Sequence, residues 1–237
     1  MQEALMSLKR DYGTAIHKEL GHYPVWDIGA PIAIGDYGTI EDRCFHRLGN
    51  IAEFGTTVEV SPPTPPVPYT FTTHGTHVTK AGFGTSIDAV GAEATLGLEF
   101  PRANSLDIRA ADSVVVTMSN IAEVGRHLKQ DVTWDRSHVF VSSARHAPAF
   151  SLLMNTSRGK AIAVKGDPAR LADLYSGRIV GSIGLDIQGD VGLSSIGVNG
   201  FIYVDLMRVR FGGGVHLEST GEATDDVEPV PIDVDDV

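Results

Sequence analysis

The longest regular pattern in the chain covers residues 178–210. Between Ile179 and Leu193 the odd positions carry apolar residues or glycine, and from Ser182 onward the even positions are small or polar. A period of two predicts strand structure with one apolar and one polar face. Near Ser195 the apolar residues move to even positions, which predicts a turn or bulge. The alternation exceeds the roughly 5–6 residues of an ordinary strand and reaches the roughly 9–11 with which a strand spans a bilayer.

A second alternation covers residues 88–118, where the even positions are mostly apolar on both sides of the stretch 101–105. It predicts one long hairpin of two strands. Shorter strands are expected over residues 69–79, 137–145 and 149–164. The last two are expected to be joined near Pro148.

Three segments predict helices. Residues 2–20 place apolar side chains near one face before Gly21. They indicate a helix docked on a sheet, with a basic helix that touches lipid as the alternative. Ser119 is an expected N-cap for a helix over 120–130, and Asp167 before Pro168 begins another that ends at Gly177.

Glycines interrupt residues 22–55 often enough to predict a small meander of short strands. The chain is therefore expected to have an α+β fold: a large, twisted, mostly antiparallel sheet with long amphipathic hairpins and a few short helices. A single domain would cover residues 1–217. It would include a small N-terminal meander within 1–60 and a proline-rich connection over 61–68.

Charge is concentrated at the C-terminus. The net charge of the 237 residues is −11, and residues 218–237 carry eight Asp and Glu and no Lys or Arg, which leaves about −3 for the body. This predicts a flexible acidic tail and argues against nucleic acid as a partner, because binding phosphates requires a basic face. The N-terminus lacks the apolar core of a signal peptide, and the single cysteine, Cys44, suits a reducing cytoplasm.

No motif indicates catalysis, a cofactor or a metal site. The glycines at 82 and 84 lack the third glycine of a dinucleotide loop, and no phosphate-binding loop occurs. His74 and His77 are three residues apart, so on one strand they would point to opposite faces, as surface histidines. Asp186, Gln188 and Asp190 share one strand face, which is expected to be solvated.

The order of elements resembles the pore-forming domain of gasdermins, particularly the short bacterial ones: a helix, a meander, an amphipathic hairpin, a short helix, further strands, a second amphipathic segment and a short tail. The resemblance covers about residues 1–217. It implies a cytoplasmic resting form that serves in cell death and antiviral defence. It also implies a tail that holds this form until a protease removes it, after which the protein enters the membrane as a homo-oligomer.

The same resemblance implies that hairpins near 88–118 and 155–194 insert into lipid. Their candidate membrane-facing residues are Val90, Leu96, Leu98, Ile108, Val114, Ile183, Leu185, Ile187, Val191 and Leu193. Spanning strands must form a closed barrel, and about four strands per chain would require many copies. The chain departs from the bacterial proteins in one respect, because Cys44 lies far from the N-terminus, where their lipid-modified cysteine is found.

A soluble β-rich binding or structural assembly protein is the alternative. In such a protein the same alternation places one face on a core and the other in water. Strand length and the spacing of glycines favour the pore, whereas the acidic balance favours the soluble protein. An enzyme is not expected, since no residues converge on a catalytic pattern.

Overall fold

The computed structural model describes residues 2–81, 94–155, 157–179, 181, 184–189, 191–211 and 227–229. The described helices are α1 (Gln2–Leu20), α2 (Ile121–Gln130), α3 (Pro168–Ser176) and a short 3-10 helix, η1 (Ile51–Phe54). The described strands are β1 (Asp36–Glu41), β2 (Cys44–Asn50), β3 (Val67–Thr72), β4 (His77–Ala81), β5 (Ala94–Glu99), β6 (Leu106–Thr117), β7 (Val139–Asn155), β8 (Ala161–Gly166), β9 (Leu185–Gly189), β10 (Val191–Val209) and β11 (Val227–Pro229).

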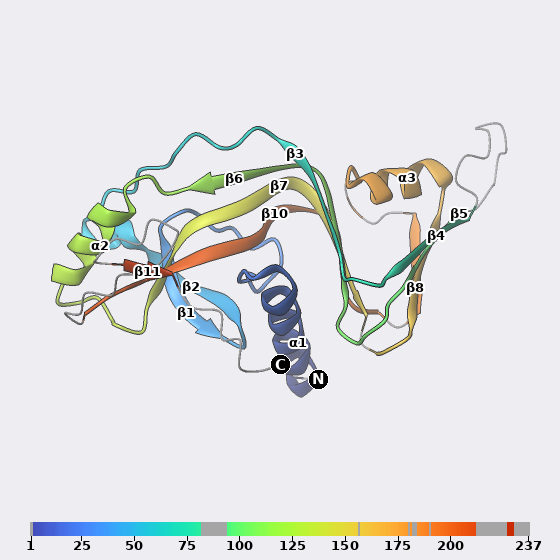
Figure 1. Ribbon diagram of the computed structural model, residues 1–237, viewed down its shortest axis with the longest axis horizontal. Coiled ribbons are helices and arrows are strands. Elements are labelled where there is room, and N and C mark those ends of the chain that lie inside the picture. Colours follow the sequence, from blue (N-terminus) through green and yellow to red (C-terminus); the bar gives the residue numbers. More distant parts are fainter. Residues whose placement is uncertain are drawn as a thin grey trace.

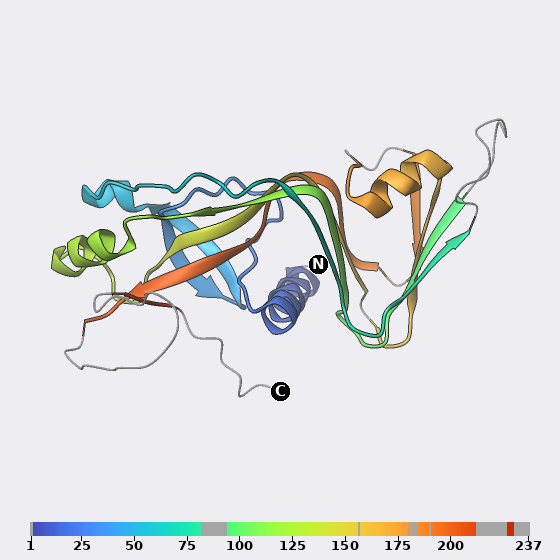
Figure 2. The same cartoon turned by 45° about the horizontal axis from the view of Figure 1, so that its top comes forward.

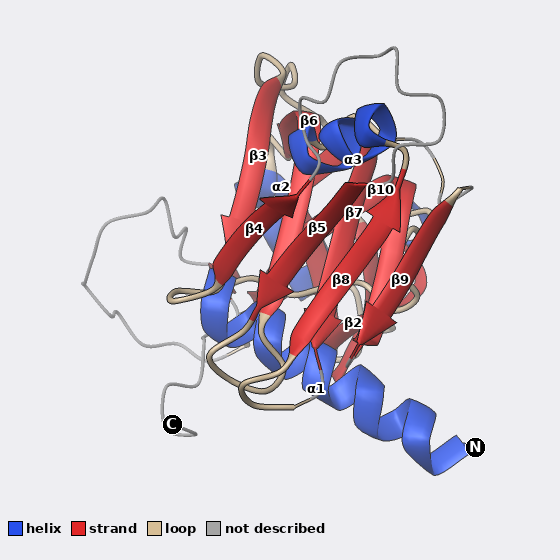
Figure 3. Cartoon of the chain, turned by 90° about the vertical axis from the view of Figure 1, so that its right-hand side faces the viewer, coloured by secondary structure: helices blue, strands red, loops and turns tan. Residues whose placement is uncertain are grey.

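The strands form two antiparallel sheets, which confirms the predicted α+β class. The larger sheet has the order β11-β10-β7-β1-β2, and β6 and β3 extend it from β7. The smaller sheet has the order β4-β5-β8-β9. Figure 1 shows the larger sheet as an arch over α1, and Figure 3 shows the smaller sheet face-on with α3 across one end.

The two sheets share four runs of chain. β3 leads into β4, β5 into β6, β7 into β8 and β9 into β10, and the lateral order of the four runs is the same in both sheets. We call these four runs the ribbon, and the described junctions 73–76, 100–105 and 157–160 the crease. Figures 1 and 2 show the ribbon running along the arch and then folding back sharply at the crease.

Two buried cores lie along the ribbon. In the first, Tyr12 and Ile16 of α1 pack against β6, β7 and β10, and we call it the α1 core. In the second, Leu171 and Leu174 of α3 pack against β5 and β8, and we call it the α3 core. A further core, which includes Trp134, joins the larger sheet to α2 and the N-terminal meander.

The predicted hairpin over 88–118 is wrong. Its two halves are strands, but β5 pairs with β4 and β8, whereas β6 pairs with β3 and β7. Residues 100–105 carry the chain from one sheet into the other. Alternation specifies the face of each residue but not the partner of the strand, so it could not distinguish a hairpin from a creased strand.

The strand boundaries near Pro148 are also corrected. β7 is one strand of 17 residues that passes through this proline. Its ladder with β10 is irregular there: Ala147 lies opposite Gly200, and Phe150 opposite Val198. Proline is accommodated within sheets at such irregularities because it has no N–H to donate. The predicted strand over 149–164 is interrupted after Asn155, and the one over 69–79 is divided at the crease.

The predicted ends of α1 and α3 and the irregularity near Ser195 are confirmed, whereas the predicted N-cap of α2 is wrong. α1 ends at Leu20, and Gly21 has a φ of 73°. The Asp167 carboxylate accepts hydrogen bonds from two N–H groups of α3, and Gly177 ends that helix with a φ of 75°. The cap of α2 is Asn120 in place of Ser119. The predicted irregularity near Ser195 is present as register shifts in β10 between residues 196 and 200.

Candidate functional site

Protein covers the predicted membrane-facing residues in this structure. Leu96 and Leu98 are buried beneath α3, and Ile108 is buried in the α1 core. The half-buried members are Val114, Leu185, Ile187, Val191 and Leu193. Val90 and Ile183 lie outside the described residues. The structure thus brings the described members onto the ribbon, and all of them except Val114 are divided between the α1 core and the α3 core.

This division follows the crease. Along β5 and β6 the even positions are the buried apolar ones, yet Leu96 and Leu98 face α3, whereas Leu106 and Ile108 face α1. One alternating stripe therefore serves both cores. The stripe faces α3 along β5 and α1 along β6, because residues 101–104 turn instead of remaining extended.

The central pair of the ribbon keeps its register through the crease. Leu106 lies opposite Met154, and Glu99 lies opposite Ala161. Both strands therefore advance by seven residues between these pairs, from 106 to 99 and from 154 to 161. Two backbone hydrogen bonds bracket the interval, from Phe100 N to Lys160 O at 3.1 Å and from Asn155 N to Ser105 O at 3.3 Å. The two long strands turn together.

Buried polar side chains hold the crease. Asn155, which is fully buried, accepts a hydrogen bond from Ser105 N at 2.8 Å and donates to the carbonyl oxygens of Arg102 and Ser157 at 2.9 and 2.6 Å. Buried Thr73 accepts from Leu106 N at 2.9 Å through its hydroxyl. These bonds satisfy backbone groups of the turns that would otherwise be buried without partners.

A buried ion pair fastens α3 to the polar face of β6. Arg109 Nε and Asp107 Oδ2 are 2.7 Å apart, and both side chains are about 5% exposed or less. Arg109 also donates to the Tyr175 carbonyl in the last turn of α3, at 3.0 Å. A cation is favourable there because the carbonyls at a helix C-terminus carry partial negative charge.

Tyr175 joins three elements. The Lys80 ammonium of β4 lies 3.3 Å from the centre of its ring, and the Arg109 guanidinium lies 4.2 Å from it. Hydrogen bonds from Lys80 and Arg109 hold the pKa of the phenol below its usual value. We call Arg109, Asp107, Tyr175 and Lys80 the α3 clasp.

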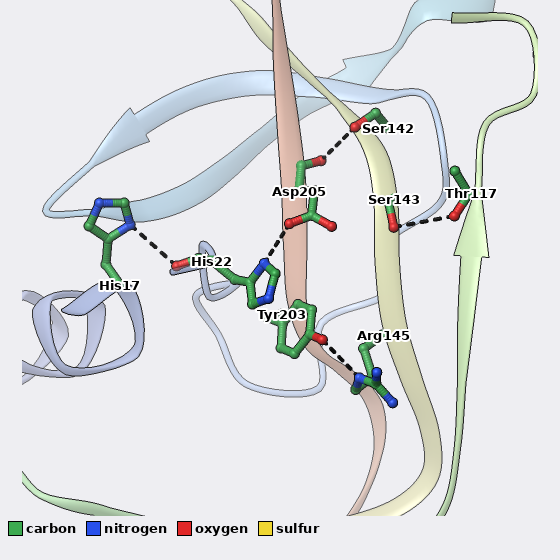
Figure 4. A network of polar contacts seen from close by, with 8 residues as sticks. All are labelled: His17, His22, Thr117, Ser142, Ser143, Arg145, Tyr203 and Asp205. Carbon is green, nitrogen blue, oxygen red and sulfur yellow. Dashed lines mark hydrogen bonds and ion pairs between the residues drawn. The ribbon is translucent and has the colours of Figure 1, made fainter. Parts of the chain in front are cut away.

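A second polar network fixes the segment after α1 to the larger sheet (Figure 4). His22 Nδ1 lies 2.5 Å from Asp205 Oδ1, and its ring stacks on Tyr203 with 3.8 Å between centroids. The Tyr203 hydroxyl accepts a hydrogen bond from Arg145 Nε at 2.8 Å. Arg145 in turn donates to Ser113 Oγ at 2.9 Å, so β10, β7 and β6 are linked across the arch.

The described part of the tail, residues 227–229, pairs with the larger sheet. β11 pairs with β10 at the end farthest from the crease, where Val227, Glu228 and Pro229 lie opposite Val209, Arg208 and Met207. A segment within the acidic tail therefore occupies part of an edge of the larger sheet.

The candidate polar residues do not form a reaction centre in the described part of the chain. His74, His77, Asp186 and Gln188 are exposed, as predicted, and the side chain of Asp190 lies outside the described residues. Within the same part, no three His, Cys, Asp or Glu side chains are grouped as metal ligands would be. An open hollow of about 470 Å³ lies at the crease, and the titratable side chains among its described lining residues are His77 and Glu99.

None of the described helices is long and apolar enough to cross a membrane. No protein-family model and no curated protein matches the sequence. Two solved structures are similar to the chain. Both are gasdermins. The first is a bacterial gasdermin from Bradyrhizobium tropiciagri, with 13% identity and a TM-score of 0.37 over 93% of this chain and 90% of that one. The second is the gasdermin A3 membrane pore, with 12% identity and a TM-score of 0.34 over 97% of this chain and 96% of that one.

The order of elements in the sequence and the two similar structures name the same family. The residues that hold the ribbon in its creased form were not predicted from the sequence. Asp107 and Arg109 occupy ordinary positions on the polar face of an alternating strand, and Asn155 falls inside a predicted strand. Their distant partners, Tyr175 for Arg109 and Ser105 for Asn155, left no local signal.

Proposed function

We propose that this chain is a non-enzymatic pore-forming protein whose ribbon straightens and enters a membrane. The observation that supports the proposal most is the single alternating stripe that crosses the crease and is covered by a different helix on each side. Straightening the crease would bring Leu96, Leu98, Leu106 and Ile108 onto one face of the strand, with the polar Arg102 and Asn104 between the two apolar pairs.

Strand length supports the same conclusion. The described strands of the smaller sheet have only five or six residues each, too few to cross a bilayer. β5 and β6 joined through the crease would run from Ala94 to Thr117. That length exceeds the roughly 9–11 residues that a membrane strand requires.

Closure of a pore then requires several copies. A straight ribbon has two outer edges, formed by β3 with β4 and by β9 with β10, and in this structure β11 and Tyr23 pair with part of the β10 edge. Within lipid every backbone N–H and C=O needs a partner, so these edges must pair with those of neighbouring chains. We infer a homo-oligomer in the membrane and a cytoplasmic resting form.

Autoinhibition is assigned to the tail. β11 occupies part of the β10 edge, the edge that a neighbouring chain would need. A protease that cuts between residues 211 and 227 would separate β11 from the body of the protein. Release of the tail would then free the edge for assembly.

The experiment is dye release from liposomes by a protein that carries an engineered protease site within residues 212–224. We expect release only after cleavage. If neither form releases dye across zwitterionic and anionic liposomes, the pore is excluded and the soluble binding protein is favoured.

Adjacent residues of β9 provide a matched control. Ile187 is half-buried and lies on the apolar face, whereas Gln188 is exposed on the polar face. Ile187→Asp is expected to reduce dye release by at least about tenfold, because a charge facing lipid is costly. Gln188→Asp should change it by less than about twofold. Equal effects of the two substitutions would contradict the assignment of faces.

A further inference from the structure

The outer edge of the ribbon does not keep its register through the crease. The last pair of the β3–β6 ladder is Thr72 with Asp107, and the nearest pair of the β4–β5 ladder is His77 with Glu99. The outer strand advances by five residues between these pairs, from 72 to 77, while its neighbour advances by eight, from 107 to 99. The two ladders are therefore offset by three residues. The tight turn at 73–76 produces this shorter path, and Thr76 N donates to Thr73 O within it at 3.1 Å.

This offset is important because the two central strands of the ribbon, β5–β6 and β7–β8, keep one register on both sides of the crease. If the crease straightens, β5–β6 and β7–β8 keep all their pairs, but β4 cannot both remain paired as it is and continue β3. We propose that β4 slides by three residues against β5 as the ribbon straightens, so that it adopts the register of β3 on β6. This inference rests on the proposed membrane insertion.

A slide by an odd number of residues exchanges the two faces of a strand. In the resting structure Val78 lies opposite Leu98, Lys80 opposite Leu96, and Ala81 opposite Thr95. If β4 instead continued the register in which Thr72 lies opposite Asp107, Lys80 would lie opposite Glu99 and Ala81 would lie opposite Leu98. The lysine thereby gains a partner of opposite charge, and apolar residues lie opposite one another.

Two substitutions on β4 distinguish the registers. In the new register Ala81 faces lipid and Val78 faces water, whereas the resting register reverses these positions. We expect Ala81→Asp to slow dye release by the cleaved protein by at least about tenfold, and Val78→Asp to change it by less than about threefold. Thermal unfolding of both uncleaved variants shows whether each has folded. The reverse order of effects in folded variants would overturn the slide.

Cysteine pairs test the register directly and do not depend on those variants. In a Cys44→Ser background, His77→Cys with Glu99→Cys reports the resting register, and Lys80→Cys with Glu99→Cys reports the new one. The second pair is three positions out of register in the resting form, roughly 10 Å along the strand, which is too far for a disulfide.

We expect the first pair to close in solution and, when closed, to block dye release until it is reduced. We expect the second pair to close only in liposomes. If the second pair fails to close in liposomes that the same variant permeabilises, the slide alone is overturned. If the wild-type chain releases no dye after cleavage, the slide and the proposed pore are overturned together.

Discussion

Arg109 holds the resting state together through three kinds of contact. It pairs with buried Asp107, donates to the end of α3 and lies against the Tyr175 ring. A buried ion pair contributes little net stability compared with apolar residues of the same shape, but removal of one partner leaves the other charge buried and unpaired. The arginine is therefore required as long as Asp107 stays buried, and its contacts with Tyr175 also hold the end of α3 on β6.

Arg109→Met is expected to lower the free energy of unfolding by about 3–5 kcal/mol, because Asp107 would remain buried without its partner. Urea denaturation measures this loss. Arg102→Met is the control, since Arg102 is half-exposed, pairs with Glu19 at 3.3 Å and should cost less than about 1 kcal/mol. Similar losses in the two variants would show that the Arg109 pair behaves as a surface ion pair.

For single residues, the sequence correctly predicted on which face of a strand a side chain lies, but not which residues it contacts. Alternation correctly separated Leu96 and Leu98 from the polar positions between them, because burial of one face imposes a period of two. It could not predict that Arg109 and Asp107 would be buried on the opposite face. Their burial depends on α3, which lies more than fifty residues later in the sequence.

Among the elements, α3 has the closest contact with the ribbon. A Cβ atom on Gly177 would lie 2.4–2.6 Å from backbone atoms of Ala110, and Ala111 N donates to Gly177 O at 3.0 Å. Only a residue without a side chain allows this approach. The end of α3 and the middle of β6 are therefore fixed to each other by backbone contacts in addition to the α3 clasp.

Gly177→Ala should displace α3 and expose the smaller sheet. Gly181→Ala is a matched control, because Gly181 has a φ of 77° against 75° for Gly177 but nothing within 4 Å of an added Cβ. Both variants lose about 1–2 kcal/mol to the left-handed backbone, and only Gly177→Ala loses a further amount of about 1–3 kcal/mol to overlap. Hydrogen exchange of β5 and β8 should rise in that variant alone. Equal exchange in both would mean that the close contact does not hold the helix.

Helices were predicted better than strand pairing, because the residues that begin and end a helix are close to it in the sequence. The bounds of α1 and α3 were predicted well because helix caps and stops lie within a few residues of the helix that they end. The hairpin over 88–118 was predicted wrongly because strand pairing is decided by chain far away, here β3, β4, β7 and β8.

For the whole molecule, the control that we assign to the tail depends on a small contact. The described pairing of β11 with β10 comprises three residue pairs. A three-residue strand forms few hydrogen bonds, so the tail is expected to bind weakly once it is cut from the body. Its effect in the intact chain then depends largely on the high local concentration that the covalent link provides.

A synthetic peptide of residues 212–237, added to the cleaved protein before liposomes, should therefore slow dye release only at high concentration, on the order of millimolar. A peptide with Val227 and Glu228 replaced by proline is the control, since proline cannot donate to a ladder. Inhibition by both peptides alike would indicate that the tail acts through its charge, not through strand pairing.

The stripe shared by the α1 and α3 cores also limits how this sequence can change over evolutionary time. If its side chains serve first as protein interior and later as a surface dissolved in lipid, selection must satisfy two solvents with one set of residues. Exchange among aliphatic residues is acceptable in both, whereas a polar replacement fails in both. Divergent homologues should therefore retain the alternation of apolar and polar positions in the stripe long after the identity of its residues has been lost.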